Sequence, residues 1–250
     1  MEVMRAWWKL SVIQLKLFLR EPEGVFFTVV FPLVLLITFG SIFGNEPVPE
    51  FGGRGTIDVS VPAYIGLVVA ISGLMSIPVS AASDREKGVL RRLRSTPVRP
   101  HAVLAAWVGV FFIVTALGSL LLVLVGRLFY GLRFGGSLFN MVMAFTLSTL
   151  SLFALGFIIA SVARSGRVAT VIGMATYFPM VFLSGATFPW EMIPKKVQTV
   201  AMVLPLTHGV QLLKGLWFGE PWSAHLVNVA VLLGTLIGGV VISAALFRWE

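Results

Sequence analysis

Hydrophobic residues lie along the chain in six long uncharged runs, rather than in the short alternating stretches of a soluble domain. An α-helix needs about 20 mostly apolar residues to cross a hydrocarbon core of roughly 30 Å. Each run reaches that length without an Asp, Glu, Lys or Arg. The pattern predicts transmembrane helices at residues 25–44, 61–82, 102–126, 137–162, 168–188 and 224–247.

Composition agrees with this pattern. Hydrophobic residues make up 57% of the chain and charged residues only 12%, and the mean hydropathy is +0.94. Soluble domains carry roughly 25% charged residues. The segments between the runs are too short for a separate globular domain, so we expect an all-α integral membrane protein with one transmembrane domain, residues 1–250.

The net charge of +8 does not indicate a nucleic-acid partner, because the basic residues lie in short loops beside apolar runs. There they attract anionic lipid headgroups, so membrane lipids are the expected partner of these charges. The chain has no cysteine, which excludes disulfides, thiolate metal sites and cysteine nucleophiles.

The distribution of Lys and Arg predicts the orientation in the membrane. Most of the 19 basic residues fall in the N-terminal segment, in residues 83–101, in residues 163–167 and in the C-terminal tail. Short loops rich in Lys and Arg stay in the cytoplasm. We therefore expect a multi-pass protein of the cytoplasmic (inner) membrane, with both termini in the cytoplasm.

Residues 1–24 are too polar to cross a membrane and too apolar to be solvated. Their basic residues share one stripe of a helical wheel, with Trp7 among the apolar residues that cover much of the rest. This pattern predicts a helix lying in the membrane interface. It serves either as a membrane anchor or as a lever that reaches a partner protein.

A second polar segment, residues 83–97, lies between the second and third predicted spans. Ser83 followed three residues later by Glu86 matches a capping box, so we expect a short cytoplasmic helix that begins there. Thr96-Pro97 ends it, because the residue before a proline avoids the α region. The segment is either a simple cytoplasmic anchor or a helix that contacts a partner.

After the fifth predicted span, residues 189–223 combine prolines with apolar stretches that are too short to cross the membrane. Such short broken helices at membrane depth are typical of re-entrant or interfacial segments packed against protein. We expect short external helices in this region.

Three sets of residues together resemble the type-2 class of ABC transporter membrane subunits, which are permeases that export drugs, lipids or polysaccharides. The first is Phe18-Leu-Arg-Glu-Pro22 leading into Phe31-Pro32. The second is Glu86-Lys-Gly-Val-Leu90 with Ser95-Thr-Pro-Val98. The third is Leu183-Ser-Gly-Ala-Thr-Phe-Pro189, followed by Met192-Ile-Pro194 and Leu204-Pro-Leu-Thr207.

The resemblance implies six transmembrane helices, an N-terminal interfacial helix and two short external helices. It also implies that the helix after the second span docks into a separate cytoplasmic ATPase. Two permeases, identical or different, would work with two ATPase subunits to export an amphiphilic, lipid-like, drug or polysaccharide substrate. ATP and Mg²⁺ would bind to the ATPase, and this chain would bind no cofactor.

The sequence contains no Gly-x-x-x-x-Gly-Lys-Ser/Thr phosphate-binding motif, so energy from ATP must come from another polypeptide. The segment after the second span is the candidate contact with that polypeptide, although its arginines could equally strengthen lipid anchoring. The candidate ATPase-coupling residues are Asp84, Arg85, Glu86, Lys87, Gly88, Arg91, Arg92, Thr96 and Pro97.

Glycine and proline interrupt the second and fifth predicted spans, at Gly73 and Pro78 and at Gly173 and Pro179. Interrupted helices in a bundle interior line substrate pathways in some transporters, and elsewhere they only shape packing. If they line a pathway here, the nearby polar candidates are Ser72, Ser76, Thr176 and Tyr177.

Two other function classes fit the sequence less well. An ion-coupled secondary transporter built from a 3+3 inverted repeat would show similarly interrupted second and fifth spans, although no ionisable residue for proton coupling lies inside a predicted span. Sodium coupling through carbonyl and hydroxyl oxygens stays open. A membrane enzyme is disfavoured because no His, Asp or Glu accompanies the hydroxyl groups deep in the spans. His101, His208 and His225 lack a metal-ligand spacing, so no metal site is expected.

Overall fold

The computed structural model describes residues 12, 14–16, 18–20, 22–89 and 100–246. Within these residues, six helices are long and apolar enough to cross a membrane, as predicted for an all-α membrane protein. They span Phe26–Phe43, Thr56–Glu86, Leu104–Tyr130, Leu138–Val162, Gly166–Leu183 and Trp222–Leu246.

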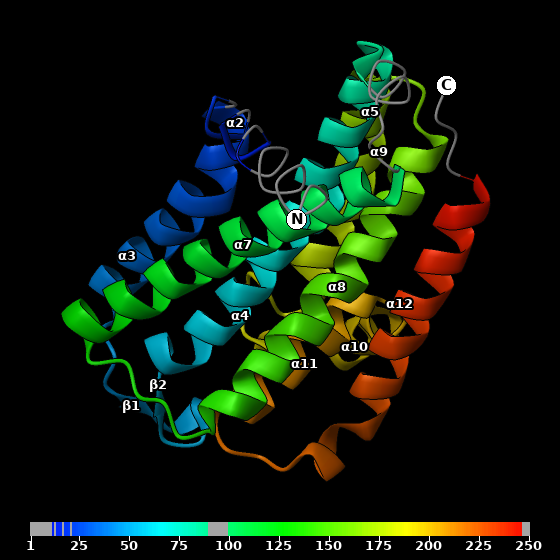
Figure 1. Ribbon diagram of the computed structural model, residues 1–250. Helices are drawn as coiled ribbons and strands as arrows, with labels where there is room; N and C mark the ends of the chain where they lie inside the picture. The colour runs from blue at the N-terminus through cyan, green and yellow to red at the C-terminus, as the bar shows by residue number, and fades with distance from the viewer. Residues whose placement is uncertain (1–11, 13, 17, 21, 90–99, 247–250) are drawn as a thin grey trace.

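The spans are built from several helical elements, which lie roughly side by side in Figure 1. The first half contains α2 (Pro22–Val25), η1 (Phe26–Val30), α3 (Phe31–Phe43), β1 (Pro47–Val48), η2 (Pro49–Phe51), β2 (Arg54–Gly55), α4 (Thr56–Ile71), η3 (Ser72–Ser76) and α5 (Ile77–Glu86). The second half contains α7 (Pro100–Tyr130), α8 (Leu138–Val162), α9 (Gly166–Leu183), η4 (Trp190–Met192), α10 (Lys195–Ala201), α11 (Pro205–Trp217), η5 (Trp222–His225) and α12 (Leu226–Leu246).

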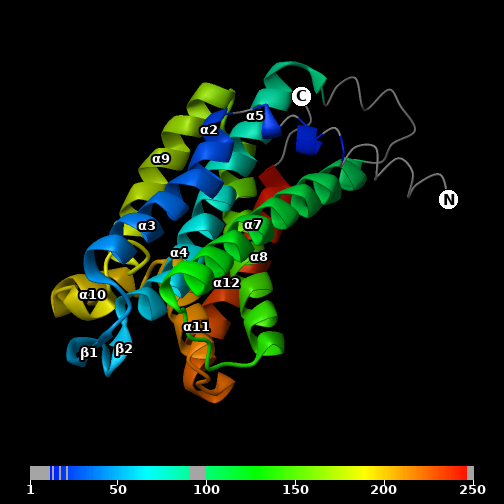
Figure 2. The ribbon, with the colours of Figure 1, turned by 90° about the vertical axis from the view of Figure 1, so that its left-hand side faces the viewer.

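The second span, α4–η3–α5, is the centre of the bundle. Inside the chain, 78% of its most apolar stretch is buried, against 11% for the last span. It packs against α3, α7, α8, α9 and α11, so most other helices touch it (Figures 1 and 2). An apolar run that is hydrophobic on every side is expected at such a position.

Two spans contain a wide π-helical turn, and each turn is followed by a proline at the same spacing. The π segment Phe26–Val30 precedes Pro32, and the π segment Ser72–Ser76 precedes Pro78. Proline lacks an N–H donor and its ring pushes against the carbonyl four residues earlier, and a wider turn relieves that crowding. The interruption predicted in the second span is therefore a local widening through which the helix continues. The fifth span, α9, passes through Gly173 and Pro179 as one α-helix without a π turn.

The widened turn of the second span lies against α8 and α9 with almost no side chain between the backbones. A Cβ atom at Gly156 of α8 would overlap the carbonyl oxygen of Gly73. A Cβ atom at Gly173 of α9 would lie 2.6 Å from the carbonyl oxygen of Leu74. Only glycine allows this approach, so these glycines set the spacing of three helices.

At the end of the bundle shown at the bottom of Figure 1, the buried carboxylate of Asp58 joins two interhelical connections. It accepts hydrogen bonds from the Arg133 backbone N–H (2.8 Å) and from the Asn45 side chain (3.1 Å). Its other oxygen accepts from the Gly55 backbone N–H (3.4 Å). The connection between α3 and α4, which includes the β1–β2 hairpin, is thereby tied to the connection between α7 and α8.

The segment between the fifth and sixth spans folds into two short helices, α10 and α11. Helix α11 is buried along most of its length and packs against α4, α8 and α12, whereas α10 contacts α9. Thr207 donates a hydrogen bond to the Ala201 carbonyl oxygen at 2.6 Å and joins the two helices. The predicted short helices are present, and α11 contributes to the core of the bundle.

Of the predicted interfacial segment 1–24, residues 1–11, 13, 17 and 21 lie outside the described residues. Phe18 is buried and packs edge-to-face against Phe111 of α7, with ring centroids 5.9 Å apart. The end of this segment is therefore attached to the third span.

We predict that Gly156→Ala destabilises the protein by about 1–3 kcal/mol, because the added methyl group must displace the Gly73 backbone. Thermal unfolding of the detergent-solubilised protein measures the change. Gly238→Ala is the matched control, since a Cβ atom there meets nothing within 4 Å. Equal melting temperatures for the two variants would contradict the close backbone contact.

Candidate functional site

The charged sequence Asp84-Arg85-Glu86 forms the last turn of the second span. We predicted that a separate helix begins at Ser83 with a capping box, and this was wrong: α5 continues without a break to Glu86. The chain then turns at Gly88, whose φ of 67° is in the left-handed region that favours glycine. The charges therefore stand at the C-terminal end of the most buried span.

Arg85 caps the end of α8. Its guanidinium donates one hydrogen bond to the Ala160 carbonyl oxygen (2.8 Å) and another to the Ala163 carbonyl oxygen. The last four carbonyl groups of a helix have no partner within the helix, and a cation there also interacts favourably with the helix dipole. Arg85 thus fixes the end of α5 to the end of α8.

Glu86 caps the beginning of α9, on the other side of the same connection. Its carboxylate accepts a hydrogen bond from the Gly166 backbone N–H at 2.9 Å, where an anion is favoured by the helix dipole. A Cβ atom at Gly166 would overlap the Ser83 hydroxyl, so Gly166 and Ser83 lie in close contact beside this bond. Although it makes this bond, the Glu86 side chain is exposed.

Asp84 faces the N-terminal segment and accepts a hydrogen bond from the Gln14 side chain at 3.2 Å. Three consecutive side chains therefore bind three different parts of the chain: the segment before α2, the end of α8 and the start of α9. We call Asp84, Arg85 and Glu86 the charged junction.

Of the nine candidate coupling residues, the structure places five at this end of the bundle. Lys87 is exposed and forms the C-cap of α5, directly after the charged junction and before Gly88. The other four, Arg91, Arg92, Thr96 and Pro97, lie outside the described residues.

The candidate pathway residues lie where η3 meets α9. Ser72 and Ser76 are buried in the widened turn, and Tyr177 is buried in the apolar core beside Leu67 and Leu74. Thr176 is half-buried and donates a hydrogen bond to the Ile172 carbonyl oxygen of its own helix. Within one chain, this region is filled by packed side chains.

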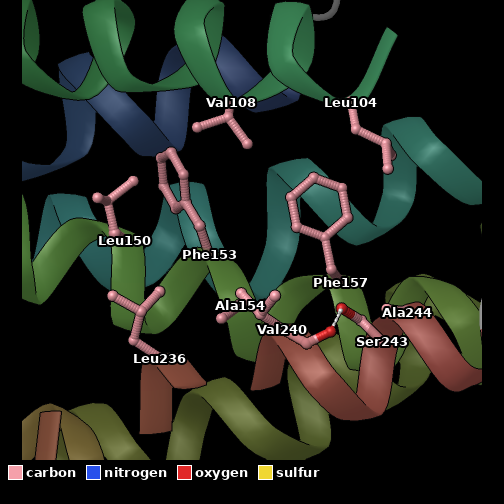
Figure 3. Close-up of a pocket in the computed structure, with 10 residues that line it drawn as sticks. All are labelled: Leu104, Val108, Leu150, Phe153, Ala154, Phe157, Leu236, Val240, Ser243 and Ala244. Carbon is pink, nitrogen blue, oxygen red and sulfur yellow. Dashed lines mark hydrogen bonds between the residues drawn. The ribbon is translucent and has the colours of Figure 1, made fainter. Parts of the chain in front are cut away.

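A separate apolar groove of about 250 Å³ lies between α7, α8 and α12 (Figure 3). Phe153 and Phe157 project from α8 toward Val108 and Leu104 of α7. On the α12 side, the hydroxyl of Ser243 donates to the Val240 carbonyl oxygen at 3.1 Å. This groove offers apolar surface without a free polar group that could orient a ligand.

A buried polar chain at the opposite end of the bundle was missed by the sequence reasoning. The amide of Asn228 bridges two histidine rings. Its Oδ1 lies 2.7 Å from His208 Nδ1, and its Nδ2 lies 3.1 Å from His225 Nδ1. The other nitrogen of His208 lies 2.8 Å from the Met202 carbonyl oxygen, and that of His225 lies 3.0 Å from a Glu220 carboxylate oxygen.

This polar chain holds α11 against the start of α12. Its three central side chains are each less than a tenth exposed, so they depend on one another for hydrogen bonds. Among the residues described, no three His, Asp or Glu side chains are grouped as metal ligands. No local sequence pattern predicts these hydrogen bonds, because His208 and Asn228 are 20 positions apart.

Comparisons with known proteins give a consistent result. A family model described as "ABC-2 type transporter" matches residues 5–218. The chain is 26% identical over 219 residues to the inner membrane transport permease YhhJ of Escherichia coli strain K12, with 82% of this chain and 57% of YhhJ covered. It thus spans little more than half of the length of that relative.

Two further relatives have similar names. The chain is 25% identical over 237 residues to ycf38 of Porphyra purpurea, named as a transport permease, with 91% of this chain and 79% of ycf38 covered. It is 24% identical over 179 residues to YbhS of Escherichia coli strain K12, named as a multidrug ABC transporter permease, with 71% of this chain and 48% of YbhS covered.

We predict that Arg85→Ala destabilises the protein by about 1.5–3 kcal/mol, because the end of α8 loses charged hydrogen bonds to two carbonyl groups. The control is Arg167→Ala in the neighbouring turn, whose side chain is exposed. Thermal unfolding in detergent compares them, and equal losses would show that Arg85 does not cap α8.

We also predict that Asn228→Leu costs about 2–4 kcal/mol, because both histidine rings lose a buried partner. Asn140→Leu on α8, a half-buried asparagine, is the control and should cost less. Melting temperatures and limited proteolysis of the α11–α12 connection provide the measurement. An intact connection in Asn228→Leu would rule out the bridging role.

Proposed function

Because the chain belongs to the ABC-2 type transporter family, we propose that it is the membrane permease subunit of an ATP-driven exporter. ATP and Mg²⁺ bind to a separate cytoplasmic ATPase, and the permease converts movement of that ATPase into movement of its helices. The resemblance in sequence and the permease names of the relatives support this proposal.

The observation that carries the proposal is the charged junction. A force applied beside Asp84, Arg85 and Glu86 acts on the central span and, through their hydrogen bonds, on the end of α8 and the start of α9. One docking point is thereby coupled to three of the six spans. Networks of hydrogen bonds and rigid helices can carry coupling between distant sites.

The exposed carboxylate of Glu86 is the docking group that we favour. One carboxylate oxygen accepts the Gly166 N–H, which leaves the other oxygen available to a partner's donor group. Lys87 follows it and is also exposed. In the proposed orientation, this end of the bundle and both termini face the cytoplasm.

A second permease copy is the other proposed partner. Helix α9 carries a stripe of exposed apolar side chains, which includes Val171, Met174, Phe178 and Phe182. Residues spaced three or four apart share one helix face, so the stripe is continuous. Packing two such faces would place the α9 helices, with Thr176 and Tyr177, near a pathway between two subunits. Two ATPase subunits complete the proposed exporter.

The proposed substrate is amphiphilic: a lipid-like molecule, a drug or a lipid-linked polysaccharide. The spans carry mostly apolar side chains and no ionised group was found deep in the predicted spans, which suits such a molecule better than a free ion. The printed name of YbhS assigns multidrug transport to that relative and is consistent with this class.

The proposal predicts that Glu86→Gln and Glu86→Ala both lower the ATP hydrolysis that the permease stimulates in its co-expressed ATPase, by about fivefold or more. Glutamine keeps an acceptor for the Gly166 N–H but has no charge, so Glu86→Gln should lower the free energy of unfolding by no more than about 1 kcal/mol. ATP hydrolysis is measured in proteoliposomes with both proteins.

Glu46→Gln is the control, since this exposed glutamate lies at the opposite end of the bundle. If Glu86→Gln stimulates ATP hydrolysis at the wild-type level, Glu86 is not the docking group. Cargo movement by vesicles that contain only this chain and an ion gradient would instead favour the ion-coupled secondary transporter.

A further inference from the structure

A second and larger groove, of about 490 Å³, lies between α7 and α8 near the end of the bundle that carries α11. Helix α7 packs mainly against α3 and α4, whereas α8 packs against α11 and α12, so the two helices diverge. The groove wall on α8 repeats every three or four residues, at Leu138, Met141, Val142 and Phe145. Leu138 is largely exposed, and Leu120 and Val142 are about half exposed.

An aromatic pair marks the inner limit of this groove. Phe112 of α7 and Phe145 of α8 meet edge-to-face, with ring centroids 5.5 Å apart. The apolar groove of Figure 3 begins on the other side of this pair, at Val108 and Leu150. The aromatic pair thus divides the α7–α8 cleft, and the larger groove has a floor.

Polar groups occur at the two ends of the groove wall that α7 supplies. Arg127 lines the mouth with an exposed side chain, and it makes no ion pair or hydrogen bond with any residue that the structure describes. Ser119 lies two turns deeper, and its buried hydroxyl also lacks a partner among those residues. The remaining α7 wall residues are Ala116, Leu120 and Val123.

From this arrangement, we propose that the groove binds an acidic phospholipid from the leaflet on the α11 side. The Arg127 guanidinium pairs with the phosphate of the headgroup, and an acyl chain lies along the apolar wall toward the Phe112–Phe145 pair. Under the proposed orientation, this is the outer leaflet. Binding of this lipid does not require an ATPase.

The chemistry of the groove agrees with this ligand at both ends. An arginine near the membrane surface attracts anionic headgroups, and its planar fork of donors fits a phosphate. From Ala116 to Arg127, the helix rises about 16 Å, which is roughly half of the hydrocarbon core. A ligand that fills this length must be apolar along its body and anionic only at its head.

A protein occupant is less consistent with the same features. Burying Arg127 in a protein interface without an acidic partner would leave a desolvated charge, and the groove itself contributes no carboxylate. A zwitterionic lipid would fit the walls but would gain less from an unpaired arginine. The unpaired cation is therefore what selects an acidic headgroup.

The test measures lipid binding to the purified full chain by native mass spectrometry and by thermal shift. Dioctanoyl phosphatidylglycerol should bind and raise the melting temperature more than dioctanoyl phosphatidylcholine, because a ligand stabilises the state that binds it. In Arg127→Gln, the apparent Kd for phosphatidylglycerol should rise about fivefold and the preference over phosphatidylcholine should disappear.

Two further variants locate the site. Arg133→Gln removes a nearby exposed arginine outside the groove and should keep the wild-type preference. Val142→Trp, at a half-exposed wall position, should fill the groove and weaken binding of both lipids. Glycerol phosphate without acyl chains should give no thermal shift, since the headgroup alone lacks the apolar contacts.

Equal binding of the two lipids by the wild type would overturn the proposal. The same holds if Arg127→Gln and Arg133→Gln weaken phosphatidylglycerol binding equally, if Val142→Trp binds as tightly as wild type, or if glycerol phosphate alone reproduces the shift. The readout is lipid affinity rather than ATP hydrolysis, so its failure is distinct from a failure of the exporter assignment.

Discussion

The structure depends on how helix ends are satisfied around one buried span. A membrane core has no water to pair with the free backbone groups at helix termini, so each group near it requires a partner from the protein. The second span provides these partners at both of its own ends. Asp58 binds backbone and side-chain donors of two interhelical connections, and Arg85 and Glu86 bind the end of α8 and the start of α9.

This arrangement gives the central span two different properties along its length. Its ends are tied to neighbouring helices by charged hydrogen bonds, while its middle contains a π turn that meets α8 and α9 through glycines. The charged hydrogen bonds at the two ends hold the neighbouring connections in place. The wide turn in the middle is where the helix can bend at modest energetic cost. Movement at the charged junction would therefore be distributed over α5, α8 and α9, with the π turn as the point of adjustment.

The same central span also explains the asymmetry of the bundle. It contacts α3 and α7 as well as α8, α9 and α11, and α7 diverges from α8 (Figure 1). The separation leaves the two grooves of the α7–α8 cleft, divided by Phe112 and Phe145. A conformational change that shifts α8 relative to α7 would change both grooves, so the proposed lipid site and the proposed coupling site share a helix.

The sequence alone determined the fold class and the six apolar helices, because apolar length is a local property that the membrane imposes on each segment separately. It also marked the charged stretch at Asp84, Arg85 and Glu86 as a candidate ATPase contact, which stays a prediction. Their contacts came only from the tertiary structure, because Ser83 and Glu86 match the capping pattern of a helix start yet close a helix that began at Ile77. In the same way, no local pattern joins His208 to Asn228, Gly73 to Gly156, or Arg127 to a groove on α8. Each of these relations lies between residues far apart in the chain, and packing of whole helices decides which of them meet.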